Sequence, residues 1–424
     1  MSIPRSPKIH GPNGIMPSSA SRSWLIGLAI LPALANAQAP QWIAEGDTYT
    51  LKIEDMSMEV IKGKGGRIIK FGIDGDNILS WDGNNGGSTL WPSPQSSWFY
   101  WPPPGAFESD DAASVGLTGG NAVLSLATKT DDATKSSLKK TIWGNTTAKA
   151  ITLQYRLYNR DSGTKKFACW EVTRIPINSL TFFPKGSNYK IVATNPGGPA
   201  DLQATVENDT MLWYQYATPT SPNKNKLFRD GGPGGWMAHL YRGMLFIRKF
   251  TDVAPSLFAP MESEVEVYAA PDLVEAENTG PYIAIPKNDS ISWSVIWYVR
   301  KVPADLDVTI GSEQLLRYVK NVIRDDSTLK LKSVNAQSTG PTLYAYPDRS
   351  WNGSATIDLT EILGDKPLEL RISDLSGKVV FTQRDVHTPI ISLHTFPPLC
   401  RGLYFVNVKS KSTTYTRTLI LGNR

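Results

Sequence analysis

The 424-residue sequence contains only two cysteines, Cys169 and Cys400. Two cysteines cannot build a disulfide framework or a cysteine-based zinc module. Because they fall in different expected domains, we interpret them as two buried free thiols rather than as one disulfide bridge.

Histidine is nearly as scarce, with four residues in the whole chain. Only His239 falls in the expected large domain, so a three-histidine catalytic zinc site cannot form there. The sequence also lacks an EF-hand calcium loop, a glycine-rich phosphate loop, a G-x-S-x-G elbow and an H-E-x-x-H motif. We therefore expect neither a cofactor nor a bound metal.

The charge pattern and the apolar runs argue against two further classes of protein, nucleic-acid-binding proteins and membrane-anchored proteins. The formal net charge is +5, without a basic stripe, which argues against a nucleic-acid partner. The apolar run Trp24–Leu34 contains Pro32 and is too short for a membrane-spanning helix, which needs about 20 residues. Basic residues precede this run and Ala35-Asn36-Ala37 follows it, which predicts a secretory signal peptide over residues 1–37 rather than a membrane anchor. Met16 is an alternative start, and no transmembrane segment is expected in the mature chain.

What the sequence does contain is typical of an all-β protein. Short β-branched and aromatic runs alternate with turn clusters, which predicts a large domain of β-strands over residues 38–325. Trp236–Phe250 has the pattern of a hairpin around Arg242-Gly243. One helix is expected, capped by Ser312 and carrying an apolar stripe at 315, 316, 319, 322 and 323. A linker over 326–342 and a small Ig-like β-sandwich over 343–424 complete the expected organisation.

Aromatic residues are concentrated in one segment, with tryptophans at 81, 91, 98 and 101. Prolines at 92, 94 and 102–104 predict a long ordered loop there rather than a regular central strand. The rings either stack on a sugar, with Gln95 bonding its hydroxyls, or fill the end of the sandwich as core. We expect Trp98 or Trp101 to be the platform and Trp91 to be core.

Several charged or polar side chains could supply chemistry, although most charged residues on strands simply face solvent. Glu275 and Glu277 are two positions apart in a predicted strand, so their side chains lie on the same face. That face is exposed either to solvent or to a cleft. His239 is either a buried core residue or a catalytic group. The remaining candidates are Arg67, Gln95, Glu108, Arg156, Glu171, Lys249, Glu262, Glu264 and Glu266.

Two groups of motifs resemble known families. The first group resembles a bacterial family of unknown function, of the DUF4380 type, which is related to galactose mutarotase-like proteins. It comprises Gly65-Gly66-Arg67-Ile68-Ile69-Lys70-Phe71, the segment Gly87–Gln95, and Gly235-Trp236-Met237-Ala238-His239. The segments Glu264–Tyr268, Glu275–Pro281 and Ser292–Tyr298 are similar to the end of aldose epimerase domains.

This first resemblance implies that residues 38–325 form a large antiparallel β-supersandwich that binds carbohydrate. In mutarotase chemistry a carboxylate takes the proton of the anomeric hydroxyl while an imidazolium protonates the ring oxygen. The resemblance therefore implies His239 as the acid and Glu277 or Glu275 as the base. The expected sugar-binding residues are Arg67, Trp91, Gln95, Trp98 and Trp101.

The second group of motifs lies at the C-terminus and resembles the sorting domain of the type IX secretion system. Leu375-Ser376-Gly377-Lys378-Val379-Val380, the strand Gly402–Val408 and the closing strand Arg417–Leu421 carry this resemblance. It implies export across both membranes of a two-membrane bacterium to the medium or the outer-membrane surface, with the secretion machinery as a partner.

Two functions remain open from the sequence. The favoured one is a secreted carbohydrate-binding protein, which needs only aromatic and polar contacts. The alternative is a carbohydrate-active enzyme on extracellular glycans, either a mutarotase-like epimerase or a polysaccharide lyase.

Overall fold

The computed structural model describes residues 40–98, 102–186, 205–208, 210–216, 226–232, 234–324, 344–347, 355–359, 362, 368–374, 377–388, 390–392, 402–409 and 414–421. The expected signal peptide, the linker over 326–342, Trp101 and Cys400 lie outside these residues. The domain boundaries therefore stay predictions. Cys169 is a buried free cysteine, as expected.

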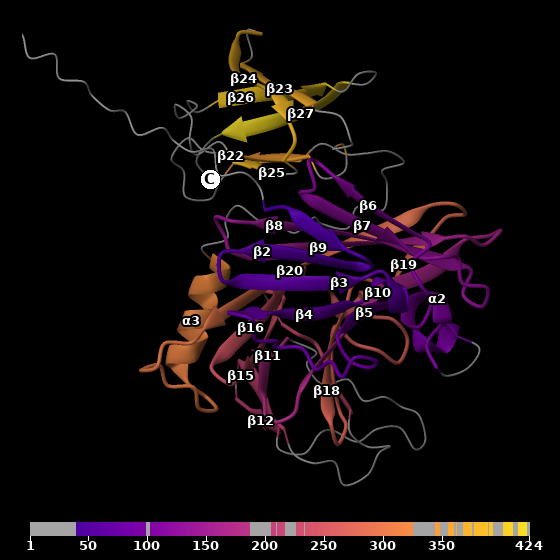
Figure 1. Ribbon diagram of the computed structural model, residues 1–424, viewed down its shortest axis with the longest axis vertical. Coiled ribbons are helices and arrows are strands. Elements are labelled where there is room, and N and C mark those ends of the chain that lie inside the picture. The colour runs from indigo at the N-terminus through magenta and orange to yellow at the C-terminus, as the bar shows by residue number, and fades with distance from the viewer. Residues whose placement is uncertain are drawn as a thin grey trace, which may run out of the picture. The chain divides into compact units, whose positions relative to one another are not determined.

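The large domain contains two ten-stranded sheets whose paired strands all run antiparallel (Figure 1). In the first sheet β19 (Ile283–Ile285) pairs with β10, off the main strand path. The main path follows the order β1 (Trp42–Glu45), β2 (Thr48–Ile53), β3 (Met56–Ile61), β4 (Ile68–Ile73), β5 (Ser88–Ser93), β10 (Lys165–Pro176), β18 (Leu273–Thr279), β17 (Val265–Ala269) and β14 (Lys226–Arg229).

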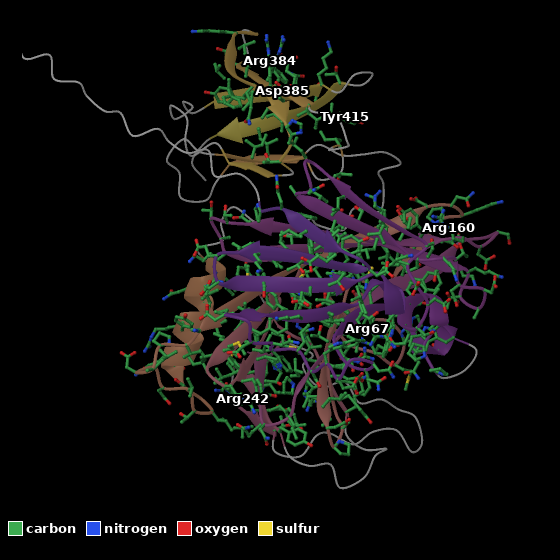
Figure 2. All side chains as sticks on the ribbon, viewed as in Figure 1. Arg67, Arg160, Arg242, Arg384, Asp385 and Tyr415 are labelled. Atoms are coloured by element: carbon green, nitrogen blue, oxygen red, sulfur yellow. The ribbon has the colours of Figure 1, made fainter. Side chains whose placement is uncertain are left out.

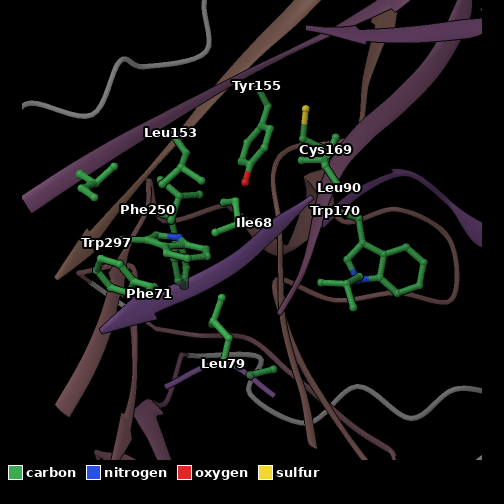
Figure 3. Close-up of a cluster of buried hydrophobic side chains, with 14 of the residues drawn as sticks. Ile68, Phe71, Leu79, Leu90, Leu153, Tyr155, Cys169, Trp170, Phe250 and Trp297 are labelled. Atoms are coloured by element: carbon green, nitrogen blue, oxygen red, sulfur yellow. The ribbon is translucent and has the colours of Figure 1, made fainter. Parts of the chain in front are cut away.

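The second sheet packs against the first through a common hydrophobic core. Figure 3 shows part of this core, including Phe71 of β4, Tyr155 of β9 and Trp297 of β20. The strand order is β12 (Thr205–Glu207), β13 (Met211–Gln215), β11 (Leu180–Pro184), β15 (Trp236–Tyr241), β16 (Met244–Lys249), β20 (Ser290–Lys301), β9 (Ala150–Asn159), β8 (Ser136–Asn145), β7 (Val123–Ala127) and β6 (Ser114–Thr118).

One long helix, α3 (Glu313–Arg324), covers the other face of the second sheet. Its apolar stripe, including Leu315, Leu316 and Val319, forms a second core with outward residues of β15 and β16. The Ser312 hydroxyl accepts a hydrogen bond from the Leu315 backbone N–H at 3.1 Å, so Ser312 caps the helix as predicted. The other helical segments in the described part of the chain are single turns: α1 (Gly63–Gly66), η1 (Gln95–Ser97), α2 (Gly105–Glu108) and η2 (Pro255–Leu257).

The predicted hairpin is confirmed as β15 and β16, with Tyr241 opposite Met244 across the turn. Arg242 and Gly243 both have positive φ, at 47° and 73°, as a two-residue hairpin turn requires. Figure 2 shows the Arg242 side chain at this turn.

The expectation that the proline-rich segment is entirely a loop is wrong for its first part. Trp91 and Pro92 lie in β5, which pairs with β10 from Ser88 to Ser93. The neighbouring β4 pairs with β5 only at Ser88. Beyond Ser88, therefore, β5 has a paired strand on one side only. On its other side no backbone N–H is needed to pair with a neighbouring strand, so proline, which has no N–H, is tolerated there.

The C-terminal region forms a separate small sandwich, as expected. A three-stranded sheet contains β21 (Tyr344–Pro347), β22 (Ala355–Asp358) and β25 (Ile390–Ser392). A four-stranded sheet has the order β24 (Val379–Val386), β23 (Leu368–Asp374), β26 (Gly402–Lys409) and β27 (Thr414–Leu421). Ile357 and Ile391 of the first sheet share one core with Leu370 and Val406 of the second.

Inside the large domain, one buried ion pair joins the two sheets. Arg248 of β16 lies 3.4 Å from Glu171 of β10 and donates to the Ala276 carbonyl of β18 at 2.9 Å. Tyr155 and Trp297 of the second sheet also donate to Glu171, at 2.6 and 3.2 Å. Both members of the pair are at most 2% exposed.

Removing one member of this pair leaves the other charge buried without compensation. We expect Arg248→Met to lower the free energy of unfolding by about 3–5 kcal/mol in urea denaturation. The double variant Arg248→Met/Glu171→Gln should lose less than the sum of the single changes, because it removes both charges. Arg317→Met, on the exposed face of α3, is the control and should change stability by less than about 0.5 kcal/mol. Additive losses would show that the two charges do not interact.

Candidate functional site

Strand alternation gives the first sheet two chemically different faces. Glu171 and Thr173 of β10 point toward the second sheet, where they contact Arg248. Trp170 and Arg174 therefore lie on the opposite, outer face. In the neighbouring strand Glu275 pairs with Arg174, so the carboxylates at 275 and 277 lie on this outer face together.

Three indole rings form the floor of the outer-face site. Trp91 meets Trp98 and Trp170 edge-to-face, with centroids 5.6 and 5.2 Å apart, and Trp98 stacks on Trp170 at 5.9 Å. Their exposed fractions are only 2%, 8% and 2% for Trp91, Trp98 and Trp170. Trp91 is therefore core, as expected, but so is Trp98, and its burial does not support the expected exposed platform.

A network of charged side chains lies against this floor. The Arg174 guanidinium lies over the Trp91 ring at 5.1 Å and donates through Nε to Glu275 at 2.8 Å. Glu108 accepts from Trp91 Nε1 at 2.9 Å and pairs with Arg67 Nη2 at 2.6 Å. Figure 2 labels Arg67, which also donates to the Gly86 and Glu108 carbonyls. The side chains of Glu108 and Glu275 are 24% and 17% exposed, against 9% for Arg174.

More carboxylates lie next to this network. Lys226 of β14 pairs with Glu266 of β17 at 2.7 Å and with Glu277 of β18 at 3.0 Å. Glu277 also accepts from Trp170 Nε1 at 2.7 Å. Burial raises the pKa of Glu277 to about 8 and that of Glu266 to about 7, although the charge of Lys226 opposes both shifts.

Glu262 is the fifth carboxylate of the site. It accepts hydrogen bonds from the Ser93 hydroxyl and from the Gln95 backbone N–H. Burial raises the pKa of Glu262 to about 7 against these two bonds. The Gln95 side chain is exposed at the margin of the site.

Arg174 Nη1 and Glu277 Oε1 are among the buried polar atoms of the site that have no hydrogen-bond partner among the described residues. One is a donor and the other is an acceptor. These atoms leave hydrogen-bonding capacity at the site that no described protein group fills.

His239 does not belong to this site. It lies on β15 of the second sheet and faces the interior of the sandwich, where its Nδ1 is 3.1 Å from the Thr181 hydroxyl. Burial, followed by the positive charge of Arg248, lowers the pKa of His239 to about 3. A neutral imidazole separated from Glu277 by the first sheet does not support the expected acid–base pairing of these two residues.

Three residues of the site had no role expected from the sequence: Trp170, Arg174 and Lys226. Period-two alternation in β10 is the signal that could have identified Trp170 and Arg174, because it separates them from Glu171 and Thr173. Lys226 begins a four-residue strand, too short to show a pattern. Only the pairing of β14 with β17 brings it to the carboxylates.

A second acidic group could hold a metal ion. The carboxylates of Asp230, Asp252 and Glu264 each offer an oxygen, and these oxygens lie within 4.8 Å of one another. Glu264 also accepts the backbone N–H groups of Val253 and Gly231 at 2.7 and 2.9 Å.

Comparison with known families decides the role of the C-terminal sandwich. The family model of the secretion system C-terminal sorting domain matches residues 346–422. This segment is a type IX sorting domain. The sorting domain implies interaction with the type IX secretion machinery and a final location at the cell surface or in the medium, as predicted. No helix in the described part of the chain is long and apolar enough to cross a membrane.

Solved structures similar to the chain include galactose mutarotase-like proteins, the group that the sequence resembles. One from Lactobacillus casei is 8% identical, with 60% of this chain and 100% of that chain covered and a TM-score of 0.44. Another, from Clostridium acetobutylicum, is 8% identical, with 62% and 98% covered and a TM-score of 0.40. A polysaccharide lyase is 9% identical, with 90% and 47% covered and a TM-score of 0.32. No curated protein matches the chain.

The sorting domain generates a prediction about export. The cores of the large domain and of the sorting domain share no residue. We expect a chain truncated before Leu343 to remain folded in the periplasm, because it lacks the segment that the secretion machinery binds. Cell fractionation and limited proteolysis measure this outcome against the full-length chain. Recovery of the truncated protein in the medium at full yield would contradict it.

The raised pKa of Glu262 should make the stability of the protein depend on pH. The folded protein holds a proton on Glu262 up to a pH of about 7, whereas the unfolded chain releases it near the ordinary value of 4.5. The free energy of unfolding must therefore fall as the pH rises through about 7. Glu262→Gln removes this loss, so we expect the variant to gain about 2–3 kcal/mol relative to the natural protein between pH 5 and pH 8.

Urea denaturation at several pH values measures this difference. Glu45→Gln, an exposed change on β1, is the control and should follow the natural protein throughout. A constant difference between Glu262→Gln and the natural protein would show that Glu262 does not titrate in this range.

Proposed function

We propose that the large domain binds carbohydrate on the outer face of the first sheet. The observation that carries the proposal is the position of Arg174. Its guanidinium lies over an indole, one of its terminal nitrogens is unpaired, and it is flanked by the half-buried carboxylates of Glu108 and Glu275.

Sugar hydroxyls match this arrangement. A hydroxyl group can accept from Arg174 Nη1 and at the same time donate to a neighbouring carboxylate, so vicinal hydroxyls can use a donor and an acceptor held side by side. Charged hydrogen bonds of this kind contribute about 1.5–3 kcal/mol each. The exposed Gln95 amide adds a further donor and acceptor at the margin of the site.

The buried indoles position these groups instead of stacking on the ligand. Trp91 donates to Glu108, Trp170 donates to Glu277, and the ring of Trp91 supports Arg174. The carboxylates and the guanidinium are thereby held in fixed orientations before a ligand arrives, which reduces the entropy lost on binding.

A second candidate function is acid–base catalysis on a sugar. Glu266 and Glu277 share Lys226, and their pKa values are raised to about 7 and 8, so near neutral pH one carboxyl can hold a proton while its neighbour is ionised. Both side chains are 0% exposed. Binding at the exposed margin is therefore the function that the geometry supports better.

The binding site is tested by two variants in a glycan array and in titrations with the glycans that bind. Arg174→Lys keeps the charge but loses Nη1, and we expect the affinity to fall about tenfold or more. Gln95→Ala should reduce it by a smaller factor, because this side chain is exposed. Arg317→Lys, on the exposed face of α3, is the matched control and should bind as the natural protein does.

Full affinity in both site variants would exclude this face as the binding site. Anomer-exchange and reducing-sugar assays on the same glycans separate the two functions. Turnover that disappears in Glu277→Gln would favour catalysis, and binding without turnover would favour a binding protein.

A further inference from the structure

Tyr268 lies on the outer face of the first sheet but has no part in the ion pairs described above. It is on β17, where it lies directly opposite Glu275 of β18 and directly opposite Lys226 of β14. Residues that face each other in an antiparallel pair point to the same side of the sheet, so Tyr268 shares the outer face with both. The three indoles of this face are buried, whereas Tyr268 is half-buried.

The position of Tyr268 places it in one row with the hydrogen-bonding end of the site. The row crosses four neighbouring strands in the order Arg174, Glu275, Tyr268 and Lys226. Neighbouring strands lie about 4.8 Å apart, so the backbones at Arg174 and Tyr268 are about 10 Å apart along the row. Both side chains are long and stand on the same face. A ligand that lies along the row can therefore contact both.

The charged ends of both neighbours of Tyr268 are held by other residues. Glu275 accepts from Arg174 Nε at 2.8 Å. The Lys226 ammonium lies 2.7 Å from Glu266 and 3.0 Å from Glu277. The accessible part of the Tyr268 ring is therefore an apolar surface beside polar groups that are already fixed in position.

A pyranose has the two kinds of surface that this row offers. Its hydroxyls lie around the edge of the ring, where they can bond to Arg174 Nη1 and to the Glu275 carboxylate. Its C–H bonds make the two ring faces less polar, and an aromatic ring is the protein surface that suits such a face. The same sugar ring can use both when its edge points to Arg174 and one face lies on Tyr268.

We propose that Tyr268 is the ring on which the bound sugar stacks, and that this face therefore selects pyranose residues with an unsubstituted C–H face. The inference rests on the proposed carbohydrate binding and names a specificity-determining residue of that same site. It assigns stacking to a single tyrosine on β17, and not to the tryptophans that the sequence favoured. The hydrogen bonds of Arg174 and Glu275 then orient the sugar, and Tyr268 contacts its apolar face.

The first experiment separates the ring of Tyr268 from its hydroxyl. The probes are cellohexaose, mannohexaose and galactohexaose, titrated by calorimetry into the mature protein. Tyr268→Phe keeps the ring, and we expect its affinity for the hexasaccharide that binds to stay within about twofold of the natural value. Tyr268→Leu keeps an apolar side chain without a ring, and we expect its affinity to fall about fivefold or more.

Tyr158→Leu is the matched control. Tyr158 is also a half-buried strand tyrosine, but it lies on β9 of the second sheet. The control variant should bind as the natural protein does. Thermal melting of all three variants shows whether each is folded at the temperature of the titration.

A second measurement needs no folded variant. Protons above an aromatic ring are shielded by its ring current, so the C–H protons of one sugar face should move upfield when the hexasaccharide binds the natural protein. Proton NMR of the ligand measures this shift. With folded Tyr268→Leu the shift should be lost, and with Tyr268→Phe it should remain.

The failures of this inference and of the proposed function are distinguishable. Natural affinity in Tyr268→Leu, an equal loss in Tyr268→Phe and Tyr268→Leu, or bound sugar without an upfield shift would overturn stacking on Tyr268. So would a failure of all three hexasaccharides to bind. In each of these cases, glycan binding in the array that weakens in Arg174→Lys would still support the proposed carbohydrate site.

Discussion

The contact between Arg248 and Glu171 joins the two sheets of the large domain. A buried charge is tolerated only when its hydrogen-bonding capacity is filled, and Glu171 accepts from Tyr155, Trp297 and Arg248 at once. This requirement fixes which face of β10 points inward. Because side chains alternate along a strand, it also turns Trp170 and Arg174 to the outer face.

The outer face depends on this orientation. Its indoles are buried and hold charged groups, of which the side chains of Glu108 and Glu275 are the most exposed. The arrangement differs from a surface of exposed indoles on which a sugar could stack, because the most exposed charged side chains are carboxylates and the indole rings are buried.

Local sequence signals predicted the regular elements well. The hairpin of β15 and β16, the cap at Ser312 and the apolar stripe of α3 each follow from residues close together in the chain. The C-terminal sorting domain was also recognisable, since its motifs are short and lie in order along the sequence. The site was predicted less well: Arg67, Trp91, Trp98, Glu275 and Glu277 do lie together, but His239 points into the core and Trp98 is buried.

The sequence by itself determined the all-β class, the single long helix and the export route, because periodicity, capping and terminal motifs act over a few residues. Only the tertiary structure decided which charges meet. Lys226, Glu266 and Glu277 come together through the pairing of β14, β17 and β18, and Arg67, the residue before β4, reaches Glu108 of α2. Strand pairing between distant segments sets these contacts. The sequence shows that a side chain is charged, but it does not show which oppositely charged residue will lie beside it once the sheet has formed.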